Sequence, residues 1–249
     1  RTSLHFGSSS APGSDWLQFR GPGGSGTAGG ENVPVSLKDK DGFAWKVDLP
    51  GRGVSSPIVL SGRVIVTASS GYRQDKLHVL CLDAKDGRRL WERQFWATGR
   101  TMCHPKTCMA APTPASDGHR ILAFYSTNDL FCLDLEGRLL WLRGLTWDYP
   151  NASNSMGMAS SPLVSGPVAV VQVENQSDSF AAGLDIGTGE NLWKVRRSSK
   201  PSWSTPVLLE GSAGASSLLL QSWDSLSGHD LATGRQLWVH DGETNCIPS

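Results

Sequence analysis

LDIGTGENLW, residues 184–193, is one of four variants of a single pattern in this 249-residue chain. Each variant has an aspartate, a turn that contains glycine, and a tryptophan four residues after the last glycine. The other three are LDAKDGRRLW (82–91), LDLEGRLLW (133–141) and HDLATGRQLW (229–238). Together with Trp45, these tryptophans recur at spacings of 46, 50, 52 and 45 residues. A period of about 40–50 residues indicates a repeat architecture, and at this length the natural unit is a four-stranded propeller blade.

The sequence around each variant predicts four strands per unit. Every unit opens with a proline after small polar residues: SSPIV (55–59), APTPA (111–115), SSPLV (160–164) and STPVL (204–208). A β-rich segment follows, then a short run that ends at the repeat aspartate, and last the tryptophan strand. The Asp–Gly turns have hairpin chemistry because glycine supplies a positive φ. We therefore expect an all-β fold of four-stranded antiparallel blades.

The second variant differs from the others in its turn. Asp134 is three residues before Gly137, whereas the corresponding spacing elsewhere is four. This turn is predicted to be tighter.

The repeat tryptophans are interpreted as large apolar plugs between neighbouring blades, each burying about 150–250 Å², rather than as ligand-stacking residues. These structural tryptophans are Trp45, Trp91, Trp141, Trp193 and Trp238.

The repeat region has an incomplete blade at each end. Residues 43–49, FAWKVDL, look like a tryptophan strand without inner strands ahead of it, and residues 246–249, CIPS, look like the start of a further proline strand. Only four units are complete, which predicts a partial ring. A closed four-bladed ring is the alternative, although it leaves both terminal strands surplus, and two such arcs could also pair into one ring.

Composition narrows the class of protein. Lys+Arg and Asp+Glu are both 23, so no basic field favours nucleic acid. The longest apolar runs are far shorter than the ~20 residues that span a bilayer. Residues 1–42 are expected to be a flexible leader and N-terminal extension, without a signal peptide in this chain, and residues 43–249 to be the blades.

Function is expected in two long linkers. From each tryptophan to the next opening proline there are 12, 23, 21 and 13 residues, so two consecutive linkers are longer by about ten. Long loops on a rigid scaffold commonly bind partners. The rim loops 95–111 and 142–159 are therefore the candidate binding surface, and a purely structural cover of the channel mouth is the alternative. The candidate residues are His104, Lys106, Asp148, Tyr149, Asn151 and Asn154.

The cysteines divide by position. Cys81 and Cys132 stand where other units have Gly183 and Gly228, so they are interpreted as small, inert core residues. Cys103 and Cys108 lie in one exposed loop, and a disulfide between them is predicted, which implies an oxidising compartment. A metal site is not predicted, because further ligands are missing nearby. The oxygen-rich residues 174–178 could suit Ca²⁺, but they lack EF-hand spacing and are interpreted as a hairpin loop.

The blade pattern resembles the pyrroloquinoline-quinone-type (PQQ-type) propeller repeat, A-x-D-x-x-T-G-x-x-x-W. The match is best at Ala232–Trp238 and Asp185–Trp193, and it covers residues 43–249. DWLQFRGPGGSG (15–26) and TMCHPKTCMAAPTP (101–114) also resemble secreted bacterial proteins with this propeller, of the kind found in Planctomycetes-like genomes. The resemblance implies a ring of seven or eight blades, of which this chain is about half.

The resemblance implies two functional precedents. Quinoprotein dehydrogenases hold PQQ and Ca²⁺ in the channel, below adjacent bonded cysteines and above a tryptophan. This chain has no adjacent cysteines, and Trp203 is the candidate for the floor below that cofactor. The other precedent is the cofactor-free lipoprotein that aids outer-membrane protein assembly.

We therefore expect a non-catalytic, extracytoplasmic (periplasmic or secreted) scaffold that binds a protein or small ligand, with no cofactor, metal, nucleic acid or transmembrane segment. A PQQ- and Ca²⁺-dependent dehydrogenase is the alternative.

Overall fold

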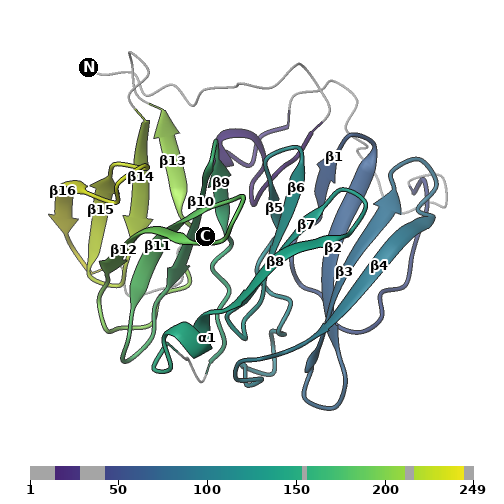
Figure 1. Cartoon of the computed structure of the whole chain (residues 1–249), viewed down its shortest axis with the longest axis horizontal. Helices are drawn as coiled ribbons and strands as arrows, with labels where there is room; N and C mark the ends of the chain where they lie inside the picture. Colours follow the sequence, from purple (N-terminus) through teal and green to yellow (C-terminus); the bar gives the residue numbers. More distant parts are fainter. Residues whose placement is uncertain (1–14, 29–42, 153–155, 211–215, 244–249) are drawn as a thin grey trace.

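The computed structural model describes residues 15–28, 43–152, 156–210 and 216–243. Their strands form four antiparallel sheets of four strands each, in sequence order, which confirms the predicted blades. Figure 1 shows the four sheets side by side in an arc, with the first and the fourth at opposite ends. The described residues therefore form an open part of a propeller, and the closed four-bladed ring is wrong for them.

Each blade is built from four consecutive strands. Blade 1 contains β1 (Ile58–Leu60), β2 (Arg63–Ser70), β3 (Lys76–Asp83) and β4 (Arg89–Trp96). Blade 2 contains β5 (Ala115–Ser116), β6 (Arg120–Phe124), β7 (Asp129–Asp134) and β8 (Leu139–Gly144), and α1 (Leu145–Asp148) follows it. Blade 3 contains β9 (Leu163–Ser165), β10 (Val168–Val173), β11 (Phe180–Asp185) and β12 (Asn191–Arg196). Blade 4 contains β13 (Val207–Glu210), β14 (Ser216–Gln221), β15 (Ser225–His229) and β16 (Gln236–Asp241).

Each described blade is joined to the segment before it by a tryptophan of that segment. The indole Nε1–H of Trp193 donates to the carbonyl of Leu231 at 2.8 Å, and its ring covers the turn glycine Gly234. A Cβ at Gly234, where φ is +69°, would lie 2.6 Å from that ring, so only glycine allows the approach. The same bond and ring contact recur at three other junctions, from Trp45 to Ala84, Trp91 to Leu135 and Trp141 to Ile186.

A small residue lies opposite the tryptophan of each fourth strand within its own sheet. Gly183 pairs with Trp193 and Gly228 with Trp238, and Cys81 and Cys132 take this place in blades 1 and 2. Both cysteines are fully buried, and burial raises the pKa of Cys81 to about 11 and of Cys132 to about 12. They are neutral core thiols, as predicted.

The turn of blade 2 is tighter than the others, which confirms the sequence prediction. The Gly137 N–H donates to Asp134 O, three residues back, whereas the Gly87 N–H donates to Asp83 O, four residues back.

A line of hydroxyl groups connects the blades along the inner side of the arc. The residue before each opening proline donates its N–H to the hydroxyl of the equivalent residue in the next blade. These bonds run from Ser56 to Thr113 at 3.1 Å, from Thr113 to Ser161 at 3.0 Å, and from Ser161 to Thr205 at 3.0 Å. The hydroxyl residue that precedes proline in each unit is thus part of the contact between blades.

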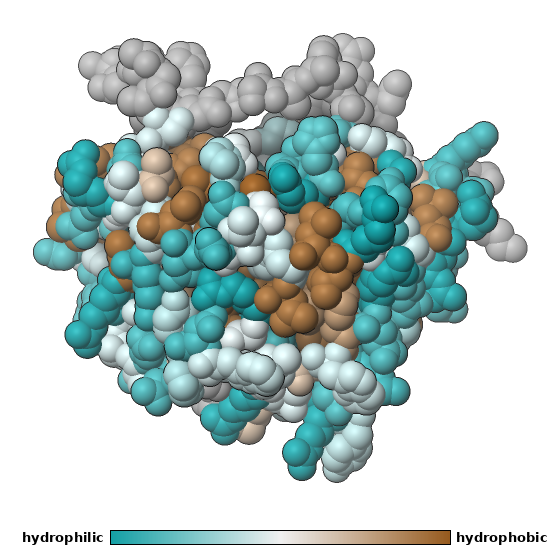
Figure 2. Space-filling view, viewed as in Figure 1, coloured by the Kyte–Doolittle hydropathy of each residue, from teal (hydrophilic) through white to brown (hydrophobic). Residues whose placement is uncertain are grey.

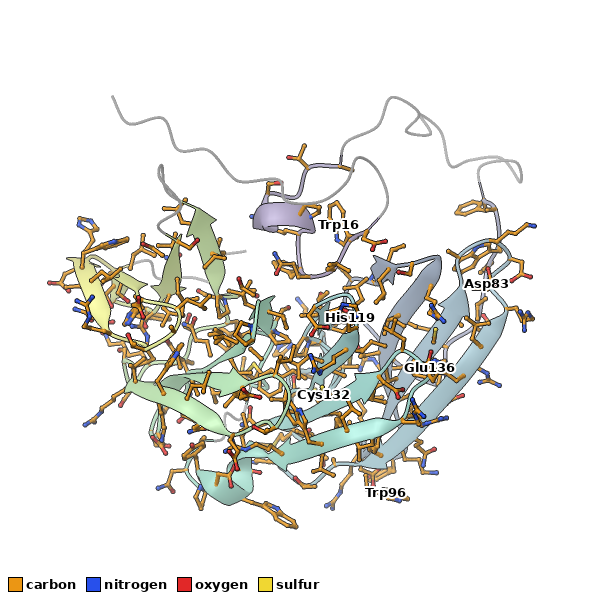
Figure 3. All side chains as sticks on the ribbon, turned by 45° about the horizontal axis from the view of Figure 1, so that its top comes forward. Trp16, Asp83, Trp96, His119, Cys132 and Glu136 are labelled. Atoms are coloured by element: carbon orange, nitrogen blue, oxygen red, sulfur yellow. The ribbon has the colours of Figure 1, made fainter. Side chains whose placement is uncertain are left out.

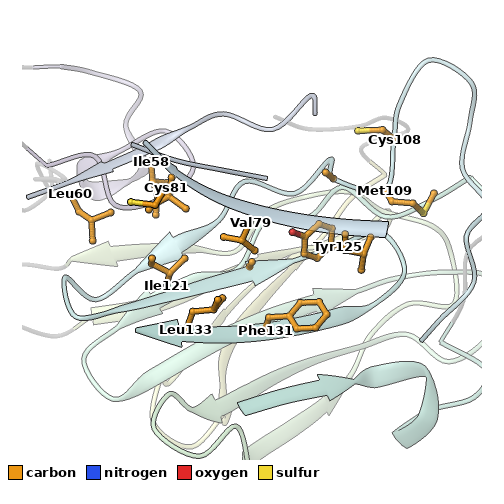
Figure 4. Close-up of a cluster of buried hydrophobic side chains, with 14 residues drawn as sticks. Ile58, Leu60, Val79, Cys81, Cys108, Met109, Ile121, Tyr125, Phe131 and Leu133 are labelled. Carbon is orange, nitrogen blue, oxygen red and sulfur yellow. The ribbon is translucent and has the colours of Figure 1, made fainter. Parts of the chain in front are cut away.

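The apolar core lies between blades rather than within one. One cluster combines Ile65 and Val79 of blade 1 with Ile121 and Phe131 of blade 2 (Figure 4). Two further clusters fill the junctions between blades 2 and 3 and between blades 3 and 4. Each sheet is therefore stabilised mainly by its neighbours.

Residues 43–49 differ from the prediction of a tryptophan strand. No strand is assigned to them, although Trp45 makes the junction contact with blade 1 described above. A strand needs a hydrogen-bonded neighbour, and no described strand lies beside these residues to supply one.

The strap, residues 15–28, also differs from the expectation of a flexible leader. The N–H groups of Trp16 and Val59 donate to each other's carbonyls at 2.7 and 2.9 Å, and the Ser116 N–H donates to Leu17 O at 2.8 Å. The short 3₁₀ helix η1 (Pro22–Gly24) then contacts β13 of blade 4. Figure 3 shows Trp16 in this segment, which crosses one rim of the arc. The leader prediction is wrong for these residues, because their backbone pairs with inner strands; residues 1–14 and 29–42 lie outside the described residues.

We predict that Trp193→Ala lowers the free energy of unfolding by about 3–5 kcal/mol, because the ring is 7% exposed and fills the junction between blades 3 and 4. Trp147→Ala is the matched control, since Trp147 in α1 is 75% exposed and should change stability by less than about 0.5 kcal/mol. Urea denaturation followed by circular dichroism measures both. Equal unfolding midpoints for the two variants would contradict the plug role.

We predict that Ser161→Ala lowers the free energy of unfolding by about 1–3 kcal/mol, because it leaves the buried N–H of Thr113 without its acceptor. Ser161→Thr keeps the hydroxyl, and threonine occupies the equivalent place in blades 2 and 4, so this control should stay near the parent protein. The same denaturation experiment compares them. A threonine variant as unstable as the alanine variant would rule out the hydrogen bond as the cause.

Candidate functional site

The long linkers lie at one rim of the arc. The segments between β4 and β5, between β8 and β9, and between β12 and β13 run along the edge that faces down in Figure 1, where α1 also lies. The strap lies at the opposite rim.

These three linkers contact one another and form one surface. The His104 N–H of the first linker donates to Met156 O of the second at 3.1 Å. The Trp203 indole of the third donates to Gly157 O at 2.8 Å. Gly157 has φ +83°, and a Cβ there would lie 2.7 Å from the Cβ of Cys103, so glycine is required for the first two linkers to approach. We call the surface formed by residues 97–111, 156–157 and 203 the linker rim.

Buried polar groups fix the first linker on the blades. Asp129, fully buried at the start of β7, accepts the Thr98 N–H at 2.9 Å and the Thr127 hydroxyl at 2.6 Å. At the other end of the linker, the Met109 N–H donates to the side chain of Gln74 at 3.1 Å, and the Ser126 N–H to Met109 O at 2.8 Å. The exposed middle of this linker is thus held by both of its ends.

The predicted binding residues do not form one site. His104 and Lys106 are exposed on the linker rim, where His104 Nδ1 accepts the Lys106 N–H at 3.1 Å. Asp148, Tyr149 and Asn151 lie instead at the outer side of the junction between blades 2 and 3. Asn154 lies outside the described residues.

Asp148 and Tyr149 connect blade 2 to blade 3. The Arg143 Nε donates to Asp148 at 3.0 Å, while its Nη1 donates to Gly189 O of blade 3 at 2.9 Å. The Tyr149 hydroxyl accepts from the Asn191 amide at 2.7 Å, and Lys194 Nζ lies 3.7 Å from the centre of the Tyr149 ring. These contacts give both residues a structural role at the junction.

Asn151 borders an open hollow of about 530 Å³. The Ser177 hydroxyl in this hollow already donates to Asn151 O at 2.7 Å. The residues that line the hollow are Asn151, Ser177, Asp178, Ser179, Lys194 and Arg196.

The predicted disulfide is not formed. Cys103 and Cys108 are both free thiols. Cys108 is fully buried in the cluster between blades 1 and 2, whereas Cys103 is half-buried against Gly157. Burial raises the pKa of Cys103, so its thiol is neutral at pH 7 and is a weak nucleophile.

A buried ion pair between Glu174 and Arg197, at the junction of blades 3 and 4, was not predicted from the sequence. Glu174 accepts from Arg197 Nε at 3.2 Å and from the Ser222 hydroxyl at 2.7 Å. Arg197 also donates to the Ser227 hydroxyl at 2.9 Å, and that hydroxyl lies 3.0 Å from His229 Nε2. The residues after Glu174 form the loop between β10 and β11, which confirms the hairpin interpretation of residues 174–178.

A Ser–His–Glu line crosses blade 1. The Ser70 hydroxyl lies 2.7 Å from His78 Nε2, and His78 Nδ1 lies 2.8 Å from Glu92 Oε1. Because the His78 side chain is only 5% exposed, the line lies within the sheet and ties β2, β3 and β4 together. No catalytic sequence motif contains these three residues. Their proximity is apparent only from the register of the three strands.

Among the described residues, no group of three or more His, Cys, Asp or Glu side chains could hold a metal ion. None of the helices in these parts of the chain has the length and apolar character to cross a bilayer. Trp203 is half-buried, and its indole N–H is used in the contact between linkers.

Comparison with known proteins gives one family. The family model described as "Outer membrane protein assembly factor BamB" matches residues 27–239. The BamB of Burkholderia pseudomallei is 25% identical over 203 residues, which cover 79% of this chain and 47% of that protein. This chain therefore spans about half the length of the curated relative it matches.

Solved structures with a similar fold include a BamB and a quinohemoprotein alcohol dehydrogenase. BamB from Moraxella catarrhalis has a TM-score of 0.56 at 19% identity, covering 81% of this chain and 56% of that one. A quinohemoprotein alcohol dehydrogenase from Pseudomonas putida has a TM-score of 0.62 at 16% identity, covering 92% and 40%. At these identities the likeness shows the fold alone.

We predict that His229 makes the protein less stable in mild acid. Burial lowers the pKa of His229, so below its unfolded pKa of about 6.5 the unfolded chain takes up a proton more readily than the folded one. The stability that the neutral ring contributes is therefore present above pH ~6.5 and is lost as the pH falls below it. Urea denaturation at several pH values between about 7.5 and 5.5 should show a smaller loss for His229→Gln than for the parent protein. Parallel losses in the two proteins would contradict this assignment.

Proposed function

Because the chain belongs to the family of the outer membrane protein assembly factor BamB, we propose that it is an extracytoplasmic, non-catalytic scaffold that binds another polypeptide through the linker rim. The relatives' name places that factor in the assembly of outer membrane proteins, a task performed on other polypeptides. An extracytoplasmic location is proposed here on the same ground.

The observation that carries this proposal is the continuity of the linker rim. Three linkers from three junctions are joined by the bonds from His104 to Met156 and from Trp203 to Gly157. Both ends of the longest one are fixed on the blades, so its exposed residues are held in place before a partner arrives. A surface preorganised in this way loses less conformational entropy on binding than a free loop does.

The exposed residues of the linker rim also have the composition of an interface. Met102 and Met156 are exposed on the same surface as the cationic side chains of Arg100 and Lys106. Methionine and arginine are enriched where proteins bind proteins, and the flexible thioether adapts to different partners.

The alternative function, a PQQ- and Ca²⁺-dependent dehydrogenase, is supported by similarity of fold alone. Ca²⁺ takes six to eight oxygen ligands. The resemblance to quinoprotein dehydrogenases implies a tryptophan below PQQ. Trp203 is the candidate floor, but its ring is tied to Gly157, and the described residues contain no cluster of acidic side chains beside it. These observations favour the scaffold over the cofactor-dependent enzyme.

We predict that a photo-crosslinking amino acid at position 102 captures a polypeptide in the extracytoplasmic fraction of the cell that encodes the chain. The matched control carries the same amino acid at Glu136, which is exposed in a turn at the opposite rim. Mass spectrometry of the adducts should give a distinct protein for position 102 only. Identical adducts at both positions, or none at position 102, would sink the proposal.

The dehydrogenase alternative has its own measurement. Calorimetric titration of PQQ with Ca²⁺ into the full-length protein separates the two functions, since saturable binding would favour the enzyme and no binding would leave the scaffold.

A further inference from the structure

The longest linker carries only one sign of charge. Residues 97–111 contain Arg100, His104 and Lys106 and no aspartate or glutamate, although Lys+Arg and Asp+Glu are equal in the whole chain. All three side chains are exposed. The positive charge of this linker is thus a local feature of an otherwise neutral protein.

Two neighbouring segments add further cations at the same place. Arg52 donates through Nη2 to Pro105 O at 3.1 Å, which places its guanidinium on the linker. The loop between β2 and β3 contacts the linker through Gln74, which accepts the Met109 N–H, and it exposes Arg73 one residue earlier. Four exposed Arg and Lys side chains from three segments therefore gather here: Arg52, Arg73, Arg100 and Lys106.

The acidic side chains of these segments do not balance this charge. The loop between β2 and β3 has one, Asp75, which is half-buried where its carbonyl accepts the Ala97 N–H. Asp148 of the second linker lies at the outer junction, where Arg143 binds it. The buried carboxylate of Asp129 contacts Thr98 beneath the linker, and the exposed charges above it are mainly positive. Complementary charge on a partner would speed its encounter with the rim and fix its orientation.

Apolar and aromatic side chains accompany the cations. Tyr72 is fully exposed beside Arg73, and Met102 and Met156 are exposed on the linkers. A nucleic acid would call for a stripe of cations along its backbone, and a membrane for a broad apolar face. Arginine, tyrosine and methionine in one patch are instead the residues that anchor protein–protein interfaces.

We propose that the partner segment bound by the linker rim is an acidic polypeptide with interspersed aromatic or apolar side chains. This inference rests on the proposed function and names the chemistry of the partner. Carboxylates of the segment pair with Arg100, Lys106 and their neighbours, while its apolar side chains pack on Tyr72 and the methionines. Arginine suits this role because its planar fork can bind a carboxylate through two hydrogen bonds.

The test uses the full chain and a fluorescein-labelled random copolymer of glutamate and tyrosine, followed by fluorescence anisotropy. We expect saturable binding that weakens when the salt concentration rises from about 50 to about 300 mM. Arg100→Glu with Lys106→Glu should raise Kd roughly tenfold, because two attractive charges become repulsive. Both side chains are exposed; within the described part of the chain, the hydrogen bond of Lys106 uses its backbone N–H, and that of Arg100 reaches the Met102 sulfur at 3.8 Å, so neither is expected to support the fold.

The matched control reverses two charges at the opposite rim of blade 1, the blade from which the longest linker leaves. Lys85 and Arg88 are exposed in the turn between β3 and β4, so Lys85→Glu with Arg88→Glu changes the net charge equally. Kd should stay within a factor of about two of the parent value, because these charges lie beyond the screening length from the rim. No saturable binding, equal weakening in both double variants, or stronger competition by single-stranded DNA or anionic lipid vesicles than by unlabelled copolymer would overturn the inference.

The crosslinking experiment separates this inference from the function it rests on. If position 102 captures a protein and the Arg100→Glu, Lys106→Glu variant captures it equally well, the scaffold stands and the acidic character of the partner is wrong. If capture is lost in that variant and kept in the Lys85→Glu, Arg88→Glu control, both are supported.

Discussion

The contact between a tryptophan and the turn glycine of the next blade determines the rest of this structure. The ring can lie on the turn only because Gly234 and its equivalents have no side chain, and the indole N–H finds its acceptor only at that distance. Two requirements therefore act at one position, a positive φ and an empty space, and glycine alone meets both. The apolar clusters form where this contact brings two sheets together.

The same junctions position the linker rim. On the inner side of the arc, the hydroxyl groups of Thr113 and Ser161 connect the segments that lead into the first strands. Each linker leaves a tryptophan strand and returns to one of these segments, so both of its ends are fixed by contacts between blades. The packing of the blades therefore determines where the linker rim lies.

The sequence predicted the parts of the structure that repeat. Four copies of one pattern establish which strand carries Trp193 and where its turn lies, because a repeat tests each assignment several times. The strap was not predicted, since the pairing of Trp16 with Val59 depends on a contact across the arc that has no local signal. The separation of Tyr149 from His104 was equally hidden, because linker length says nothing about which way a loop folds. The Glu174–Arg197 pair joins loops 23 residues apart, and only the packed junction shows that both side chains are buried.

The direction of the tryptophan contact has a consequence for how disorder spreads. Each described blade receives on its turn a tryptophan ring from the segment before it, so these contacts join nearest neighbours along a line. The strap, which contacts blades 1, 2 and 4, is the exception. Such a system follows the statistics of a one-dimensional chain, in which damage at one junction loosens two sheets and decays with distance. Trp193 is 7% exposed where blades 3 and 4 meet, so its loss is expected to loosen those two sheets and to leave the junction between blades 1 and 2 nearly intact.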